Sequence, residues 1–167
     1  MSSEKKALVV YFSHEGNTKF VAEKIAELAD ADILELKPKK PLAAKEGIGK
    51  FFWGGSKVYM RTKPELKKFK VDPTDYDLLF IGTPVWAWTF APPLRTFFSD
   101  VKLKKKKIAL FACNEGGLKK TFEKMKKELP GNEFIGEIDF FAPVKAGKEK
   151  KAEKQLEKWV KQMLKKV

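Results

Sequence analysis

The sequence predicts an α/β fold, with a parallel sheet of five strands and helices on both faces of the sheet. Short apolar runs alternate along the chain with longer amphipathic stretches, which is typical of strand–helix–strand units. The strongest apolar runs are also continuous, which indicates strands buried on both faces, as in a parallel sheet. With 167 residues, 43% of them hydrophobic, the chain can form a single domain over residues 1–167.

The first half of the chain supplies two strands and one helix. Ala7 to Phe12 reads A-L-V-V-Y-F, a continuous run of strand-forming residues. Thr18 to Ala29 carries apolar residues at three- and four-residue spacing, so it predicts an amphipathic helix. Asp32 to Lys37 alternates between apolar and charged residues, which favours an outer strand.

The second half continues the alternation to the end of the chain. Further buried strands are predicted at Leu78 to Thr83 and Lys107 to Cys113, and the last strand at Phe134 to Phe141. Apolar residues at helical spacing predict helices over Pro92 to Val101, over Leu118 to Leu129, where Pro130 and Gly131 follow, and over about Lys148 to Val167.

The stretch from Pro41 to Pro73 has a less regular pattern. It contains four glycines, and an aromatic segment runs from Phe51 to Met60. We interpret it as a broken helix that covers the sheet. An aromatic flap beside a ligand, a dimer contact and a membrane-surface patch remain alternatives.

The composition excludes several kinds of protein. There are 35 Lys and Arg against 22 Asp and Glu, a net charge of +13. The only arginines are Arg61 and Arg95, although arginine is the usual reader of bases and phosphates. Abundant Lys and Glu with few amide side chains are typical of proteins from hot environments. We therefore expect no nucleic-acid binding.

Cysteine usage and hydropathy point to a protein of the cytoplasm. Cys113 is the single cysteine, so an intramolecular disulfide and a cysteine-built zinc site are excluded. No secretory signal and no apolar run of about 18 residues is present, so we expect no membrane span. A phosphatase built on Cys113 would need an arginine six positions later, where Lys119 stands.

Three loops that follow predicted strands carry the candidate chemistry. The first reads S-H-E-G-N-T and joins a strand to a helix, where free N–H groups and the helix dipole attract an anion such as phosphate. The second, from Gly82 to Pro93, contains two tryptophans that could stack on a flat ligand. The third reads C-N-E-G-G, and its glycines let the backbone approach a ligand edge. An ordinary helix cap is the alternative for the first and third loops, and packing on the sheet edge is the alternative for the second; a cap explains one polar residue of the first loop better than five small or polar residues in six.

Together these loops resemble the flavodoxin family, and the resemblance spans nearly the whole chain. It implies the sheet order 2-1-3-4-5 and one bound FMN. It implies that the FMN phosphate is held by Ser13, His14, Glu15, Gly16, Asn17 and Thr18. The two sides of the isoalloxazine ring would be flanked by Thr83, Pro84, Val85, Trp86 and Trp88, and by Asn114, Glu115, Gly116 and Gly117.

This chain departs from the family pattern at three points. Glu15 stands where the family often has threonine, and we expect its carboxylate to turn away from the phosphate. Ala87 stands in a loop where family members often have a glycine at which a peptide flips toward the flavin, and we expect it to make that flip costlier. The chain is also basic, whereas family members are usually acidic.

Two functions follow from the resemblance. The first is an electron carrier between redox proteins, which needs no catalytic side chain or metal; its partner would present an acidic face to this lysine-rich chain. The second is an NAD(P)H-dependent FMN or quinone reductase, with Trp53, Tyr59 or Phe90 lining a pocket over the flavin. We favour the carrier because no second dinucleotide motif is present.

Overall fold

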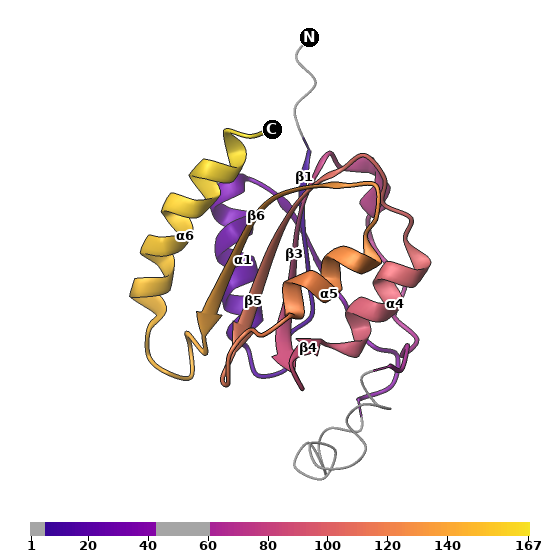
Figure 1. Cartoon of the computed structure of the whole chain (residues 1–167), viewed down its shortest axis with the longest axis horizontal. Coiled ribbons are helices and arrows are strands. Elements are labelled where there is room, and N and C mark those ends of the chain that lie inside the picture. The colour runs from indigo at the N-terminus through magenta and orange to yellow at the C-terminus, as the bar shows by residue number, and fades with distance from the viewer. Residues whose placement is uncertain (1–5, 43–60) are drawn as a thin grey trace.

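Helices cover both faces of a twisted sheet (Figure 1). The structure is a computed structural model that describes residues 6–42 and 61–167. The strands are Ala7–Tyr11 (β1), Asp32–Glu35 (β2), Leu78–Trp86 (β3), Thr89–Phe90 (β4), Lys107–Asn114 (β5) and Glu133–Phe141 (β6). The helices are Asn17–Ala29 (α1), Pro92–Asp100 (α4), Thr121–Glu128 (α5), Glu149–Leu164 (α6) and the short 3-10 helix Pro73–Asp75 (η3).

The strand order is β2-β1-β3-β5-β6, and neighbouring strands along this path are parallel. This confirms the predicted five-stranded parallel sheet and its order. The chain leaves β1 to one side to form β2 and returns on the other side to form β3, so the order reverses at β1. The carboxyl ends of the strands meet at the lower edge of the sheet in Figure 1. In open α/β sheets, ligands bind at this edge, beside the point of reversal.

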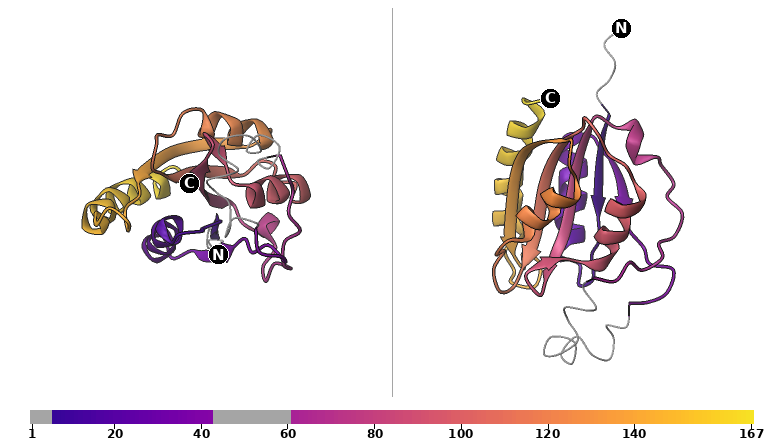
Figure 2. Two further views of the ribbon diagram at one scale, coloured as in Figure 1. Left: turned by 90° about the horizontal axis from the view of Figure 1, so that it is seen from below. Right: turned by 45° about the vertical axis from the view of Figure 1, so that its right-hand side comes forward.

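The continuous apolar runs reflect burial on both faces of the sheet. Side chains alternate along β1, so Leu8 and Val10 pack in the same core as α4 and α5. Val9, between them, packs in the opposite core, with α1 and α6. Figure 2 shows these two helical layers from below. Because neither face meets water, an alternating polar pattern would be costly, and the run stays apolar.

Some boundaries differ from the predicted ones. The strand expected to end at Thr83 continues to Trp86 and turns back as β4, which pairs antiparallel with β3. The helix expected from Leu118 begins at Thr121, because the backbone turns at Lys119, which has a φ of 49°. A hydrogen bond from the hydroxyl of Thr121 to the carbonyl of Leu118 closes this turn at 2.7 Å.

A broken helix was expected over Pro41 to Pro73, and the described part of that stretch does not confirm it. The aromatic segment from Phe51 to Met60 lies outside the described residues. Residues 61–72 form no helix; Leu66 makes an isolated bridge with Pro38, and Phe69 packs against the core. Among the described residues, no helix is long and apolar enough to cross a membrane.

Candidate functional site

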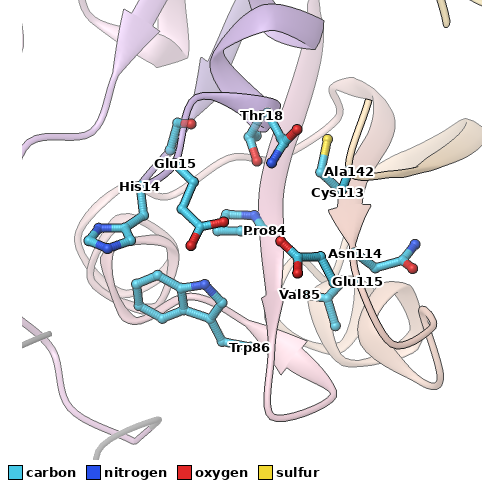
Figure 3. A pocket seen from close by; sticks show the side chains of 12 residues that line it. His14, Glu15, Thr18, Pro84, Val85, Trp86, Cys113, Asn114, Glu115 and Ala142 are labelled. Carbon is cyan, nitrogen blue, oxygen red and sulfur yellow. The ribbon is translucent and has the colours of Figure 1, made fainter. Parts of the chain in front are cut away.

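A cavity of about 230 Å³ opens at the carboxyl ends of β1, β3 and β5 (Figure 3). It lies at the edge that the fold predicts for a ligand. All but two of its lining residues were predicted for the site from the sequence. The lining consists of Ser13, His14, Glu15, Asn17, Thr18, Pro84, Val85, Trp86, Cys113, Asn114, Glu115 and Ala142.

The loop between β1 and α1 forms one wall of the cavity. Gly16 precedes the helix in the left-handed region, with a φ of 96°, a conformation that glycine adopts without strain. No side chain in the described chain caps this helix start, and no acidic residue stands in its first turn. Its N–H groups and the positive end of its dipole are therefore suited to an anion.

The hydroxyl of Ser13 lies beside this helix start and is buried. Among the described residues it is the one buried side-chain oxygen or nitrogen without a hydrogen-bond partner. Leaving a buried hydroxyl unpaired costs about 1–3 kcal/mol. A buried polar group left unpaired at a cavity wall indicates a partner that arrives from outside the protein.

Asn17 has a structural role at this wall. Its side-chain oxygen accepts hydrogen bonds from the N–H groups of Val144 and Lys145, at 3.0 and 3.2 Å. The first turn of α1 is thereby tied to the segment that follows β6. Thr18 is buried and forms a side-chain hydrogen bond with Cys113.

A tight hairpin between β3 and β4 forms the second wall. Trp86 pairs with Thr89, so Ala87 and Trp88 make a two-residue turn. Both have positive φ angles, 47° and 60°, as a type I′ turn requires. Thr83 does not line the cavity; its hydroxyl accepts a hydrogen bond from the N–H of Ala91 at 3.0 Å and so supports the hairpin.

The three aromatic side chains of the hairpin have different roles. Trp86 lines the cavity and makes edge contacts with the rings of Phe12 and His14, at centroid distances of 5.6 and 5.7 Å. Trp88 is 59% exposed at the tip of the turn, outside the cavity lining. Phe90 is 1% exposed and belongs to the core, so the expectation that it could line a pocket over the flavin is wrong.

The loop after β5 forms the third wall. The side-chain oxygen of Asn114 accepts the N–H of Gly117 at 3.1 Å, and its amide nitrogen donates to Asp139 at 3.0 Å. These bonds fix the shape of the turn. Glu115 lines the cavity, whereas Gly116 and Gly117 are not among the residues that line it.

A fourth segment of the site, from Ala142 to Lys148, follows β6 and was not predicted from the sequence. Ala142 lines the cavity, and its N–H donates to the carbonyl of Asn114 at 2.9 Å. Lys145 extends to Glu115 and contacts both carboxylate oxygens, at 2.9 and 3.0 Å. The position of this segment after a parallel strand was a signal that could have revealed it, because all such strands end at one edge.

Charge at the cavity mouth is concentrated on two carboxylates and one ammonium group. The carboxylates of Glu15 and Glu115 both lie toward the cavity in Figure 3; that Glu15 turns away from a bound phosphate stays a prediction. The hydrogen bond with Glu115, and the charges of Glu115 and Glu15, raise the pKa of Lys145. Lys145 thus stays protonated and balances part of the negative charge.

Cys113 is the other lining residue that the sequence analysis did not assign to the site. It is a buried thiol on β5, only 5% exposed. Burial raises the pKa of its thiol to about 12, and Asp139 adds to this effect. The thiol therefore stays protonated and is a poor nucleophile.

Known proteins resemble this chain in fold and in sequence. A candidate flavoprotein from Bacteroides eggerthii DSM 20697 is 25% identical with a TM-score of 0.78, over 95% of this chain and 98% of that chain. A flavoprotein from Lactobacillus acidophilus NCFM, solved in complex with FMN, is 28% identical with a TM-score of 0.64. The match covers 85% of this chain and 97% of that chain. Oxidised flavodoxin 2 from Bacillus cereus is 18% identical with a TM-score of 0.61, over 97% of this chain and 99% of that chain. At this identity the likeness shows the fold alone.

No curated protein matches this chain. A family model described as flavodoxin does match it, over residues 6–163. That match begins just before β1 and ends in α6, so it includes every strand of the sheet and the cavity at its edge. The chain therefore belongs to the flavodoxin family.

Proposed function

We propose that this protein binds one FMN non-covalently in the cavity at the carboxyl edge of the sheet and carries electrons between protein partners. The observation that carries the proposal is the buried, unpaired hydroxyl of Ser13 beside the uncapped start of α1. A phosphate there receives a hydrogen bond from the hydroxyl and from N–H groups of the helix start. The FMN complex of the related Lactobacillus acidophilus flavoprotein supports this ligand.

The isoalloxazine ring fits between the hairpin and the loop after β5. Trp86 offers an aromatic surface from one wall, and the backbone around Glu115 forms the other. Stacking on an aromatic ring contributes about 0.5–1.5 kcal/mol beyond the area that is buried. Bound FMN supplies the electron chemistry, and the chain holds, orients and partly shields the ring.

A carrier needs only to hold its cofactor and meet its partners. The lining of the cavity combines small and polar side chains with the aromatic ring of Trp86, and the buried thiol of Cys113, whose pKa is raised, stays protonated. The alternative, an NAD(P)H-dependent reductase, would need a nicotinamide site. Trp53 and Tyr59, expected to line such a site, lie outside the described residues.

The partner of this carrier presents an acidic face. Exposed lysines include Lys119 and Lys120, which follow β5 in the chain, and Lys145, which follows β6 and contacts Glu115 of the cavity lining. The chain as a whole carries a net charge of +13. Such a surface steers an acidic protein toward the site and repels a basic one.

Two measurements test this function. The purified protein should be yellow or become so with FMN, and it should bind FMN more tightly than riboflavin, which lacks the phosphate. A protein that binds neither would refute the proposal. NADH and NADPH should each leave the flavin oxidised unless a second redox protein is added; bleaching by either nucleotide alone would instead identify a reductase.

A further inference from the structure

We propose that Lys145 raises the protein's affinity for reduced FMN relative to oxidised FMN, by neutralising Glu115 beside the ring. This inference rests on the proposed function, because it requires FMN in the cavity. Two electrons and one proton convert the oxidised ring into the reduced ring, which carries one negative charge near neutral pH. A carboxylate near the ring disfavours that charge, and a cation favours it.

Glu115 is placed to act on the ring. It lines the cavity, and in Figure 3 its carboxylate lies at the mouth, together with that of Glu15. The lining contains these two carboxylates and, within the described residues, no lysine or arginine. Without a cation from elsewhere, the site would oppose a reduced flavin.

Lys145 supplies that cation from outside the lining. Its ammonium group contacts both carboxylate oxygens of Glu115, at 2.9 and 3.0 Å, and Glu15 also acts on it through charge. The side chains of Lys145 and Glu115 are 60% and 47% exposed, so the contact adds little to stability. The consequence of the contact is electrostatic: the ammonium group of Lys145 neutralises the negative charge of Glu115 at the mouth of the cavity.

The backbone fixes the position from which Lys145 acts. Its N–H and that of Val144 donate to the side-chain oxygen of Asn17 in the first turn of α1. Two hydrogen bonds to one side chain thus join the segment after β6 to the helix start, while the lysine side chain reaches to the loop after β5. The backbone of Lys145 is therefore anchored at the helix start, and from there its ammonium group reaches the carboxylate of Glu115.

The test measures dissociation constants for oxidised FMN and for FMN reduced with dithionite, at one pH and ionic strength. Lys145→Gln should lower the affinity for reduced FMN relative to oxidised FMN, and Glu115→Gln should raise it. One charge at roughly 10 Å changes an equilibrium constant by about two- to twentyfold, for an effective dielectric constant of about 20–80. In the double variant, which carries both Lys145→Gln and Glu115→Gln, the ratio of the two affinities should stay within about twofold of the wild-type value. The same is expected of Lys145→Arg.

Lys148→Gln is the matched control. It removes the same charge from the same segment, but the ammonium nitrogen of Lys148 lies over the ring of Phe141, 5.3 Å from the ring centroid. The ratio of the two affinities should therefore stay within about twofold of the wild-type value. An equal change in Lys148→Gln and Lys145→Gln would show that total charge is responsible, and would overturn the inference.

The sign of each effect separates a charge effect from a structural one. If the contact only held two loops together, Lys145→Gln and Glu115→Gln would both weaken binding and would change the ratio in the same direction. That result, or an unchanged ratio in Lys145→Gln, overturns this inference while FMN binding stands. If the wild-type protein binds FMN in neither state, the proposed function fails, and this inference fails with it.

Discussion

Replacing Ser13 with alanine should affect the apoprotein and the FMN complex in opposite directions. In the apoprotein, the hydroxyl oxygen of Ser13 is buried without a partner. An unpaired buried hydroxyl costs about 1–3 kcal/mol. Ser13 as a residue is only partly buried, so we expect the lower end of this range: Ser13→Ala should raise the free energy of unfolding by about 1 kcal/mol.

In the proposed FMN complex, the same hydroxyl would donate to the phosphate. A hydrogen bond to a charged group contributes about 1.5–3 kcal/mol, so its loss should weaken FMN binding by about ten- to a hundredfold. Riboflavin has no phosphate, and its affinity should change by less than about twofold. The preference for FMN over riboflavin should therefore shrink in this variant.

Titration calorimetry with FMN and riboflavin, and urea unfolding of the apoprotein, measure these quantities. Ser99→Ala is the control, because Ser99 lies on α4, away from the cavity, where its hydroxyl accepts a hydrogen bond from Lys63. It should leave both affinities unchanged. If Ser13→Ala weakened FMN and riboflavin binding equally, or destabilised the apoprotein, the hydroxyl would not be a phosphate ligand.

Four further outcomes are expected. Trp86→Ala should weaken binding of FMN several-fold by fluorescence titration, because a stacked ring contributes about 0.5–1.5 kcal/mol; unchanged affinity would assign the stacking elsewhere. Ala87→Gly should raise the free energy of urea unfolding by about 0.5–1 kcal/mol, because φ is 47° there. A destabilised variant would contradict that φ. Folding keeps the Cys113 thiol protonated up to a pKa of about 12, whereas the unfolded chain loses this proton near pH 9. The free energy of unfolding should therefore fall as pH rises from about 9 to 12, less steeply in Cys113→Ala; equal slopes would show that other groups dominate. Electron transfer to an acidic protein partner should slow as salt is added, and a rate independent of salt would argue against steering.

Much of the sheet is predictable because its signal is local. The run from Ala7 to Phe12 is apolar at every position, and the structure buries all of these residues. Two helix faces are required to cover such strands, so the layered fold follows from the pattern. Loops that follow parallel strands must meet at one edge, which is why three of the walls were found.

The position of the fourth wall after a parallel strand was predictable, but its contacts were not, because they join residues that are distant in sequence. The bond between Asn17 and Val144 joins residues 127 positions apart. Neither the segment after β6 nor Asn17 carries a local pattern that indicates this contact. The sequence favoured Asn17 as a phosphate ligand, whereas its side-chain oxygen is occupied by backbone N–H groups.

The hairpin between β3 and β4 escaped prediction for a different reason. A two-residue type I′ turn is normally signalled by Asn-Gly or a similar pair, and the chain has Ala87 and Trp88 there instead. A left-handed conformation costs about 1–2 kcal/mol for such residues. Contacts from elsewhere compensate: Lys124 donates to the carbonyl of Trp88 at 3.1 Å, and Thr83 accepts the N–H of Ala91.

This turn also changes what Ala87 implies for a flavin beside it. From the sequence, alanine in place of glycine was expected to make a peptide flip costlier. In the structure Ala87 already has a positive φ, so the costly conformation is present before any ligand binds. The strain is borne by the fold, through contacts that do not involve the cavity. A movement of the backbone at Ala87 would release this strain rather than create it, so the absence of glycine does not by itself hold the loop still.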